Sequence, residues 1–353
     1  MDTEPSGSHS IPESAVAAGA SEGVPAGQGG HRRGDIGGFI LRRLLLGLLV
    51  LWLVSVVVFA ATQALPGDPA RAILGRTATP ASLKALREQL GLNRSVILQY
   101  ADWITGLLRG DLGTSLAAQV PVSQLLGDRL VNSAFLVLCA GLVSIPFSII
   151  VGSYAALRRD RSFDHATSLV TLLLAALPEF VVGVGLVVLF ATTVFHVLPA
   201  ISLIPPGTRP WTLPMGMILP TLTLVLAVTP YVARIMRASM VEVLESEYVE
   251  MARLKGLPER IVIRRHALPN ALGPTFQVIA INLAYLAGGV IVVEYIFNYA
   301  GIGGALRDAV SNRDLPVVQT LAMLIAAIYV ILNLMADIAT ILVTPRLRMR
   351  LEG

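Results

Sequence analysis

The sequence predicts an all-α membrane protein with six transmembrane helices, and three observations lead to this prediction. Of the 353 residues, 54% are hydrophobic and only 14% are charged, and the mean hydropathy is +0.71. Six apolar stretches are long enough to cross a bilayer. Arginine and lysine fall mostly in the loops on one side of these stretches. Because a soluble domain carries about 25% charged residues, the composition excludes an ordinary cytosolic enzyme, and its hydrophobicity excludes a wholly disordered chain.

The six stretches define the predicted spans. A spanning helix needs about 20 predominantly apolar residues, because the hydrocarbon core is about 30 Å thick. Lipid offers no hydrogen-bond partner to the backbone, so such stretches must be helical. The alternating segments of about ten residues that build a membrane β-barrel are absent from the sequence. The predicted spans cover residues 39–65, 130–157, 166–195, 214–236, 274–297 and 317–343.

Residues 1–35 differ in composition from the rest of the chain. They are rich in Gly, Ser, Ala and Pro and lack apolar periodicity, which predicts a disordered cytoplasmic tail. The apolar run from Phe39 continues past Ala61, longer than the roughly 7–15 residues of a signal-peptide core. We therefore expect this run to remain as a membrane anchor and residues 36–353 to form one transmembrane domain.

Positive charge predicts the orientation of the chain. With the N-terminus in the cytoplasm, 17 of the 27 Lys and Arg residues fall on the cytoplasmic side, and the largest group, seven of them, lies in the loop of residues 234–273. The short outer loops then carry three, and the remaining seven lie in residues 66–129. Because short cytoplasmic loops are enriched in Lys and Arg, both termini are predicted to be cytoplasmic.

Residues 66–129 are predicted to form an extracytoplasmic elaboration after the first span. The sequence Leu65-Pro-Gly-Asp-Pro69 disfavours continuation of the first helix. Residues 83–90 have helical spacing and are followed by Gly91, a residue suited to a helix C-terminus. Residues 99–108 predict a second short helix that ends before Gly110.

The loop of residues 240–273 is the longest predicted cytoplasmic loop. Its first part predicts a polar helix in which Glu250 and Arg253 can pair at i, i+3. Gly256 is placed to end this helix in the left-handed conformation, and Pro258 suits the first turn of a second helix. Two short helices tethered to flanking spans could pass a push from a soluble partner into the membrane. The alternative is a solvated basic loop that only fixes the topology.

Motifs in this loop resemble a known family. Glu250-Met-Ala252, then Gly256, then Leu268-Pro269 resembles the EAA loop of ABC-importer permeases, with Met251 replacing the second motif residue. The run 265–272 is similar to the dipeptide/oligopeptide branch. Further matches, which together resemble the B-type permease subunit, are Leu65-Pro-Gly-Asp-Pro69, Gly110-Asp-Leu-Gly-Thr-Ser115, Gly301-Ile-Gly303, Arg313-Asp-Leu-Pro-Val-Val-Gln319, Asn333, Asp337 and Pro345-Arg346. The tail of residues 1–35 lies outside the resemblance.

The resemblance implies the type I permease fold and import of short peptides across a bacterial inner membrane. It implies a heterodimer with a C-type permease, two cytoplasmic ATPase subunits and an extracytoplasmic peptide-binding protein, and no nucleic-acid partner. The EAA segment would couple to the ATPase. The implied coupling residues are Glu247, Glu250, Ala252, Gly256, Leu257, Pro258, Leu268 and Pro269. No Gly-x-x-x-x-Gly-Lys-Ser/Thr phosphate loop occurs, so we expect no cofactor in this chain and ATP with Mg²⁺ on the partner subunits.

Polar residues inside the predicted spans are the other candidates for function, since ionisable groups are costly at membrane depth. Glu179, Asn282 and Glu294 are candidates for the translocation pathway, although water or a headgroup could also solvate Glu294 near the outer end of its span. Asn333 and Asp337 share one helical face and are expected to form interhelical hydrogen bonds. The single cysteine, Cys139, excludes a cysteine-based metal site, and we expect no metal site in the chain.

Other function classes fit the sequence less well. An intramembrane zinc protease needs His-Glu-x-x-His, which does not occur, and an aspartyl type needs two facing carboxylates where the spans offer only Asp337. An ion-coupled secondary transporter favours internal repeats, and none is evident. An importer of nickel or haem with the same architecture stays open, because a binding protein would deliver either cargo.

Overall fold

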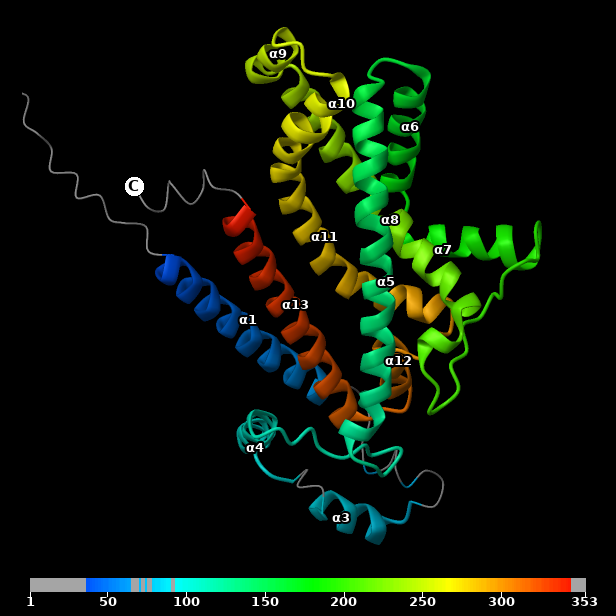
Figure 1. Ribbon diagram of the computed structural model, residues 1–353. Helices are drawn as coiled ribbons and strands as arrows, with labels where there is room; N and C mark the ends of the chain where they lie inside the picture. The colour runs from blue at the N-terminus through cyan, green and yellow to red at the C-terminus, as the bar shows by residue number, and fades with distance from the viewer. Residues whose placement is uncertain (1–35, 65–69, 71–73, 75–77, 90–92, 344–353) are drawn as a thin grey trace, which may run out of the picture.

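The computed structural model describes residues 36–64, 70, 74, 78–89 and 93–343, and these are almost entirely helical (Figure 1). Apart from one isolated β-bridge between Thr114 and Pro121, the described residues contain no strand pairing. Four helices are each long and apolar enough to span a membrane, and two bent helix pairs bring the number to six if each pair is one span. The four are α1 (Ile36–Ala64), α5 (Val122–Leu157), α8 (Pro214–Leu244) and α13 (Leu315–Val343). The predicted fold class is therefore confirmed.

The third predicted span is not a single helix. It consists of α6 (Ser162–Ala176) and α7 (Glu179–Val187), which continues as a π-helical turn, Val188–Thr192. The two parts are bent by 106° at Leu177-Pro178. A residue before proline is pushed out of the helical region, and Leu177 is extended, with φ −92° and ψ 130°. The predicted span over 166–195 is therefore interrupted at its proline.

Three other helices are longer than the apolar stretches that predicted them. Helix α5 begins at Val122 and α8 ends at Leu244, so both extend beyond the predicted apolar stretches. Helix α11 (Leu268–Ile296) begins inside the predicted cytoplasmic loop and is bent by 49° between Leu286 and Gly288. Polar ends of a helix add length without adding hydropathy, so the apolar pattern alone missed them.

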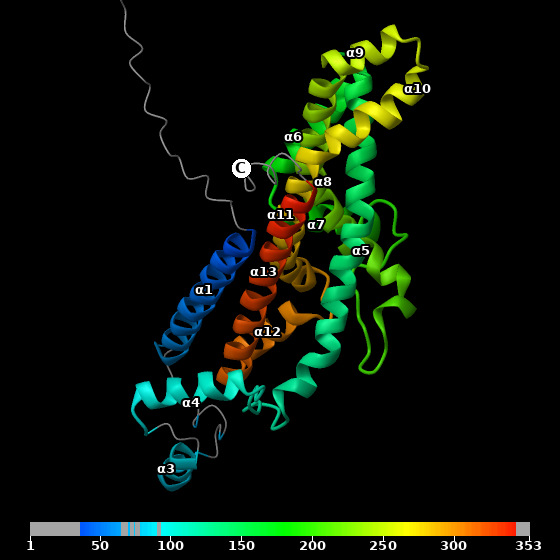
Figure 2. The same cartoon turned by 60° about the vertical axis from the view of Figure 1, so that its left-hand side comes forward.

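The core lies where α8 packs against α5 and α11, and α6 and α7 also pack on α8. The largest cluster of buried side chains joins these helices; it includes Leu136, Val182, Leu224, Val232 and Leu286. Helix α1 packs along α13, and the two form a layer beside the core (Figures 1 and 2). Most of the surface of α1 is left exposed and apolar, as expected for a helix that faces lipid or another membrane subunit.

The short helices gather at two opposite ends of the molecule (Figure 1). One end holds α9 (Glu247–Leu254) and α10 (Glu259–Ile261), and the other holds α3 (Pro80–Gln89), α4 (Val96–Leu108) and α12 (Ile302–Ser311). Helices α3 and α4 confirm the two short helices predicted for the outer segment. The predictions for the 1–35 tail, for Leu65–Pro69 and for Gly91 lie outside the described residues, as does Pro345-Arg346.

Candidate functional site

The segment between α8 and α11 forms an elbow, defined here as residues 245–269. Helix α8 ends at Leu244, and α9 starts after Ser246. Gly256 follows the last turn of α9; it has φ +75°, and an added Cβ would have nothing within 4 Å. Its N–H donates to the carbonyl of Arg253 at 2.9 Å. The predicted left-handed glycine at the end of this helix is confirmed.

Helix α9 has a buried side and an apolar exposed side. Val249 and Ala252 are buried against Val262, so Ala252 faces the interior of the elbow. On the other side Tyr248, Met251 and Leu254 are exposed, and Leu254 is 74% exposed. Glu247 and Glu250 are exposed in the first turn. A helix that shows an apolar stripe to solvent, beside acidic residues, presents a surface suited to docking a protein partner.

Arg253 closes the elbow, but with a different partner from the one the sequence indicated. Its guanidinium donates to both carboxylate oxygens of Glu259, at 2.8 and 3.2 Å, across the turn at Gly256. No salt bridge joins it to Glu250 in the described part of the chain, so the predicted Glu250–Arg253 pair was wrong. The hydrogen bond with Glu259 raises the pKa of Arg253. Arg253 pairs with Glu259 and not with Glu250 because the turn brings Glu259 back alongside α9.

The second limb of the elbow is continuous with the fifth span. Pro258 precedes α10, and a π-helical segment, Val262–Ala267, joins α10 directly to α11. Leu268 and Pro269 form the first turn of α11. Pro269 has no N–H to donate, and the Asn270 side chain donates to the carbonyl of His266 at 2.6 Å. A second separate short helix was expected, whereas the structure has an extension of α11.

Glu179 lies where α7 meets α11. It occupies the first turn of α7, directly after Pro178. The hydroxyl of Tyr285 donates to Glu179 Oε2 at 2.8 Å. The carboxylate also lies against Gly289, where an added Cβ would be 3.2 Å from Oε1. Tyr285 is 51% exposed, so this cluster is at the surface of the single chain.

Asn282 and Glu294 lie in different surroundings from Glu179. Asn282 is almost fully buried and donates to the carbonyl of Val278 on its own helix at 2.8 Å. Glu294 is completely buried, so the expectation that water or a headgroup solvates it was wrong. Its carboxylate accepts from the hydroxyl of Ser133 on α5 and from the N–H of Gly303 in α12, the latter at 2.7 Å. Glu294 therefore caps the N-terminus of α12 and joins three helices.

Asp337 and Asn333 make one contact between helices and one within a helix. Asp337 of α13 forms a 3.0 Å ion pair with Arg43 of α1. Asn333 donates to the carbonyl of Tyr329 on its own helix at 2.8 Å. The predicted contact between helices is thus found for Asp337, as an ion pair. The hydrogen bond of Asn333 stays within its own helix.

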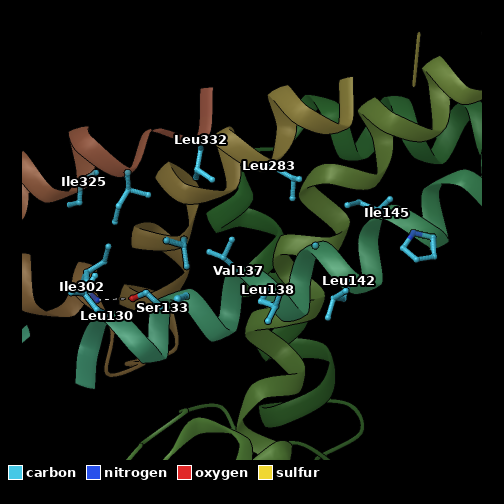
Figure 3. Close-up of a pocket in the computed structure, with 15 residues that line it drawn as sticks. Leu130, Ser133, Val137, Leu138, Leu142, Ile145, Leu283, Ile302, Ile325 and Leu332 are labelled. Atoms are coloured by element: carbon cyan, nitrogen blue, oxygen red, sulfur yellow. Dashed lines mark hydrogen bonds between the residues drawn. The ribbon is translucent and has the colours of Figure 1, made fainter. Parts of the chain in front are cut away.

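An apolar cavity lies between α5, α11 and α13 (Figure 3). Its volume is about 540 Å³, and Ser133 is the only described lining residue with a polar side-chain atom. The Ser133 hydroxyl accepts the N–H of Ile302 at 2.9 Å and donates to Glu294. Such a lining suits hydrocarbon and offers no group to hold a polar cargo. Among the described residues no group of His, Cys, Asp and Glu side chains could hold a metal ion.

Residues 144–349 match the family described as "Binding-protein-dependent transport system inner membrane component", and residues 37–136 match the N-terminal part of such membrane components. The chain belongs to this permease family. A "Probable peptide ABC transporter permease protein" of Sinorhizobium fredii is 38% identical over 89% of this chain and 100% of that protein.

A second relative agrees with this assignment. A "Glutathione transport system permease protein" of Salmonella choleraesuis is 34% identical over 88% of this chain and 98% of that protein. A solved structure titled "Crystal structure of an amino acid ABC transporter with histidines" has a TM-score of 0.45 and 18% identity, covering 64% of this chain and 94% of that one. The family resemblance seen in the motifs is confirmed by the sequence matches.

Two of the motifs that resemble this permease family meet in space, which the sequence did not indicate. Asp314, from the 313–319 motif, is buried and accepts from the hydroxyl of Ser115 in the 110–115 motif. It also accepts from the N–H groups of Leu116 and Ala117, at 3.0 and 3.2 Å. These bonds fasten the loop before α5 to the turn between α12 and α13. The sequence held one signal for this: Pro316 lies two residues after Asp314, and a proline is typical of the first turn of a helix.

Proposed function

We propose that this chain is the B-type permease subunit of an ATP-binding-cassette importer that carries short peptides across the inner membrane. Family membership supports a role in binding-protein-dependent transport. Relatives that are 34–38% identical over nearly their whole length are named for peptides and for glutathione, itself a tripeptide. The chain then performs no covalent chemistry.

In this proposal the chain works within a larger complex. A C-type permease forms the heterodimer, an extracytoplasmic binding protein delivers the peptide, and two ATPase subunits bind ATP and Mg²⁺. The end that holds α9 faces the cytoplasm together with both chain termini. ATP-driven approach and separation of the ATPases switch the permease pair between outward-open and inward-open states.

The observation that carries the proposal is the construction of the elbow. Exposed Tyr248, Met251 and Leu254, with Glu247 and Glu250, form the surface that the ATPase contacts. Gly256, Leu257 and Pro258 make the turn, and Leu268-Pro269 begin the helix that leads into the membrane. Because the second limb is continuous with α11, displacement of α9 passes directly to a spanning helix.

The test is the ATPase activity of the reconstituted complex with its binding protein. The panel contains di- to pentapeptides, glutathione, haem and nickel, each supplied with the same binding protein. We expect peptides alone to stimulate hydrolysis. Stimulation by haem or nickel alone would overturn the cargo and keep the architecture. Uptake that follows an ion gradient and needs no ATP would overturn the ATP-driven mechanism.

A further inference from the structure

The break between α6 and α7 leaves backbone polar groups at the middle of a span. Leu177-Pro178 lies near the centre of the stretch 166–195. No side chain caps the start of α7, so the N–H groups of Glu179 and Phe180 have no partner within that helix. Irregular backbone at membrane depth does not face lipid; it is covered by protein or lines a water-filled cavity. The face of the chain at this break is therefore not a lipid surface.

A second break lies beside the first. Helix α11 bends between Leu286 and Gly288, and Tyr285 and Gly289 flank that bend. Both residues contact Glu179, one through the 2.8 Å hydrogen bond and the other through close packing. Two bent spans thus meet at one carboxylate, near the middle of each.

The same face carries a small polar and aromatic cluster. Tyr285, whose hydroxyl donates to Glu179, is 51% exposed, so its ring is accessible on the same face as the carboxylate. Glu179 forms no salt bridge with any cation of the described ranges, and its Oε1 accepts no hydrogen bond there. An ionisable residue within a span faces a protein interior or water and pairs with another group. Within the described residues the Glu179 carboxylate thus has a hydroxyl partner and no cation, and it is placed to take a cation from outside them.

We propose that Glu179, with Tyr285 beside it, binds a protonated amino group of the cargo, as at the N-terminus of a peptide, on its way through the membrane. A carboxylate forms strong charge-assisted hydrogen bonds with an ammonium group, and tyrosine rings attract cations. The cluster is surface-exposed in the single chain, so a second permease that covers this face would enclose it. The inference rests on the proposed function, since it names the part of a peptide that the permease recognises.

The test compares peptide uptake with ATP hydrolysis in the reconstituted complex, using one peptide-loaded binding protein throughout. Glu179→Gln keeps the size of the side chain and an acceptor for Tyr285, and removes only the charge. We expect peptide uptake to fall about tenfold, since a hydrogen bond to a charged group is lost. ATPase stimulation should stay within about twofold of the parent, and Glu179→Asp should recover part of the uptake. The matched control is Glu88→Gln, an exposed glutamate on α3, which should change neither rate.

A second pair of variants tests the cluster without touching the charge. Tyr285→Phe removes the hydroxyl that holds Glu179 and should lower uptake about threefold. Tyr329→Phe, on an exposed tyrosine of α13, should leave uptake unchanged. The inference is overturned if the complex with Glu179→Gln takes up peptide at the parental rate. It is also overturned if the substitution lowers uptake and ATPase activity together, or if it prevents assembly with the second permease. The last result would assign Glu179 to an ion pair with that subunit. If the parent complex itself transports no peptide, the proposed function fails instead.

Discussion

The two ends of the molecule are held together in opposite ways. At the end that holds α3, α4 and α12, two buried carboxylates, Glu294 and Asp314, accept hydrogen bonds from backbone N–H groups and serine hydroxyls. We call this pair the anchors. At the other end, the elbow is closed by a glycine turn, a small apolar cluster and the ion pair Arg253–Glu259, whose side chains are 42% and 54% exposed.

This difference has a physical meaning. A buried carboxylate that loses its donors pays a large desolvation penalty, so the anchors permit one arrangement of α5, α11, α12 and α13. An exposed ion pair contributes little and can open in water. The end that holds the anchors is therefore a rigid frame, and the elbow is the part that can move.

The strongest test of the frame is Glu294→Ala. It leaves the Ser133 hydroxyl and the first N–H groups of α12 buried without an acceptor, and we expect a loss of about 3 kcal/mol in stability. The measurement is the thermal midpoint of the purified complex in detergent. Glu242→Ala, on an exposed position of α8, is the control and should stay close to the parent. Equal midpoints for the two variants would contradict the anchor role.

The second anchor should show a smaller effect. Asp314→Asn removes one of two acceptor oxygens that receive three hydrogen bonds, and we expect a loss of about 2 kcal/mol. Asp308→Asn breaks only partly exposed ion pairs with Arg129 and Arg307, and its cost should stay below about 1 kcal/mol. The comparison of these two midpoints, measured side by side, separates a buried anchor from a surface pair.

At the elbow, Gly256→Val should impair transport more than stability. A left-handed backbone costs a residue with a Cβ about 1–2 kcal/mol, so we expect the turn to reorganise and peptide uptake to be lost while membrane insertion is retained. Gly207→Val is the matched control, because Gly207 also has positive φ, +78°, and nothing within 4 Å of an added Cβ. Normal uptake in the Gly256 variant would remove the basis for a coupling role of the elbow.

The smallest effect is expected at the ion pair itself. A double-mutant cycle with Arg253→Ala and Glu259→Ala should give a coupling energy of about 0.5 kcal/mol, since both groups are exposed. The coupling should shrink further at about 1 M salt, where the screening length is only about 3 Å. A coupling energy of several kcal/mol would show that the elbow is held as firmly as the rigid frame, and the proposed difference between the two ends would be wrong.

Local sequence patterns predicted the features that depend on local chemistry. Hydropathy located the four helices that can span a membrane and the two bent helix pairs, because burial in lipid requires long apolar runs wherever they occur. The position of Gly256 predicted a left-handed turn, because few other residues tolerate that backbone. Pro178 carried the signal for the break in the third predicted span, because the residue before a proline is pushed out of the helical region, but the apolar run gave no measure of the 106° bend.

The features that depend on distant residues were not predictable in this way. Ser115 and Asp314 lie 199 positions apart, and no periodicity connects them. Glu294 was identified as a candidate by its charge alone, and its cap on α12 became visible only when Ser133 and Gly303 were placed around it. Gly301 belongs to the same arrangement, since a Cβ there would overlap the Glu294 carboxylate. Tertiary packing decided whether each acid was buried or exposed.

The π-helical segment Val262–Ala267 holds one residue more than ordinary helical winding would hold. Because the π-turn takes up this extra residue within one turn, deleting one residue there should restore ordinary winding and leave the apolar stripe of α9 on the same side of the molecule. The α-helical part of α11 has no such turn, and each of its residues turns the chain by about 100°. Deleting one residue from it should therefore rotate α9 by about that angle around the axis of α11, with every side chain of the stripe unchanged. The direction of the elbow thus depends on the number of residues that lead into the membrane as well as on their chemistry.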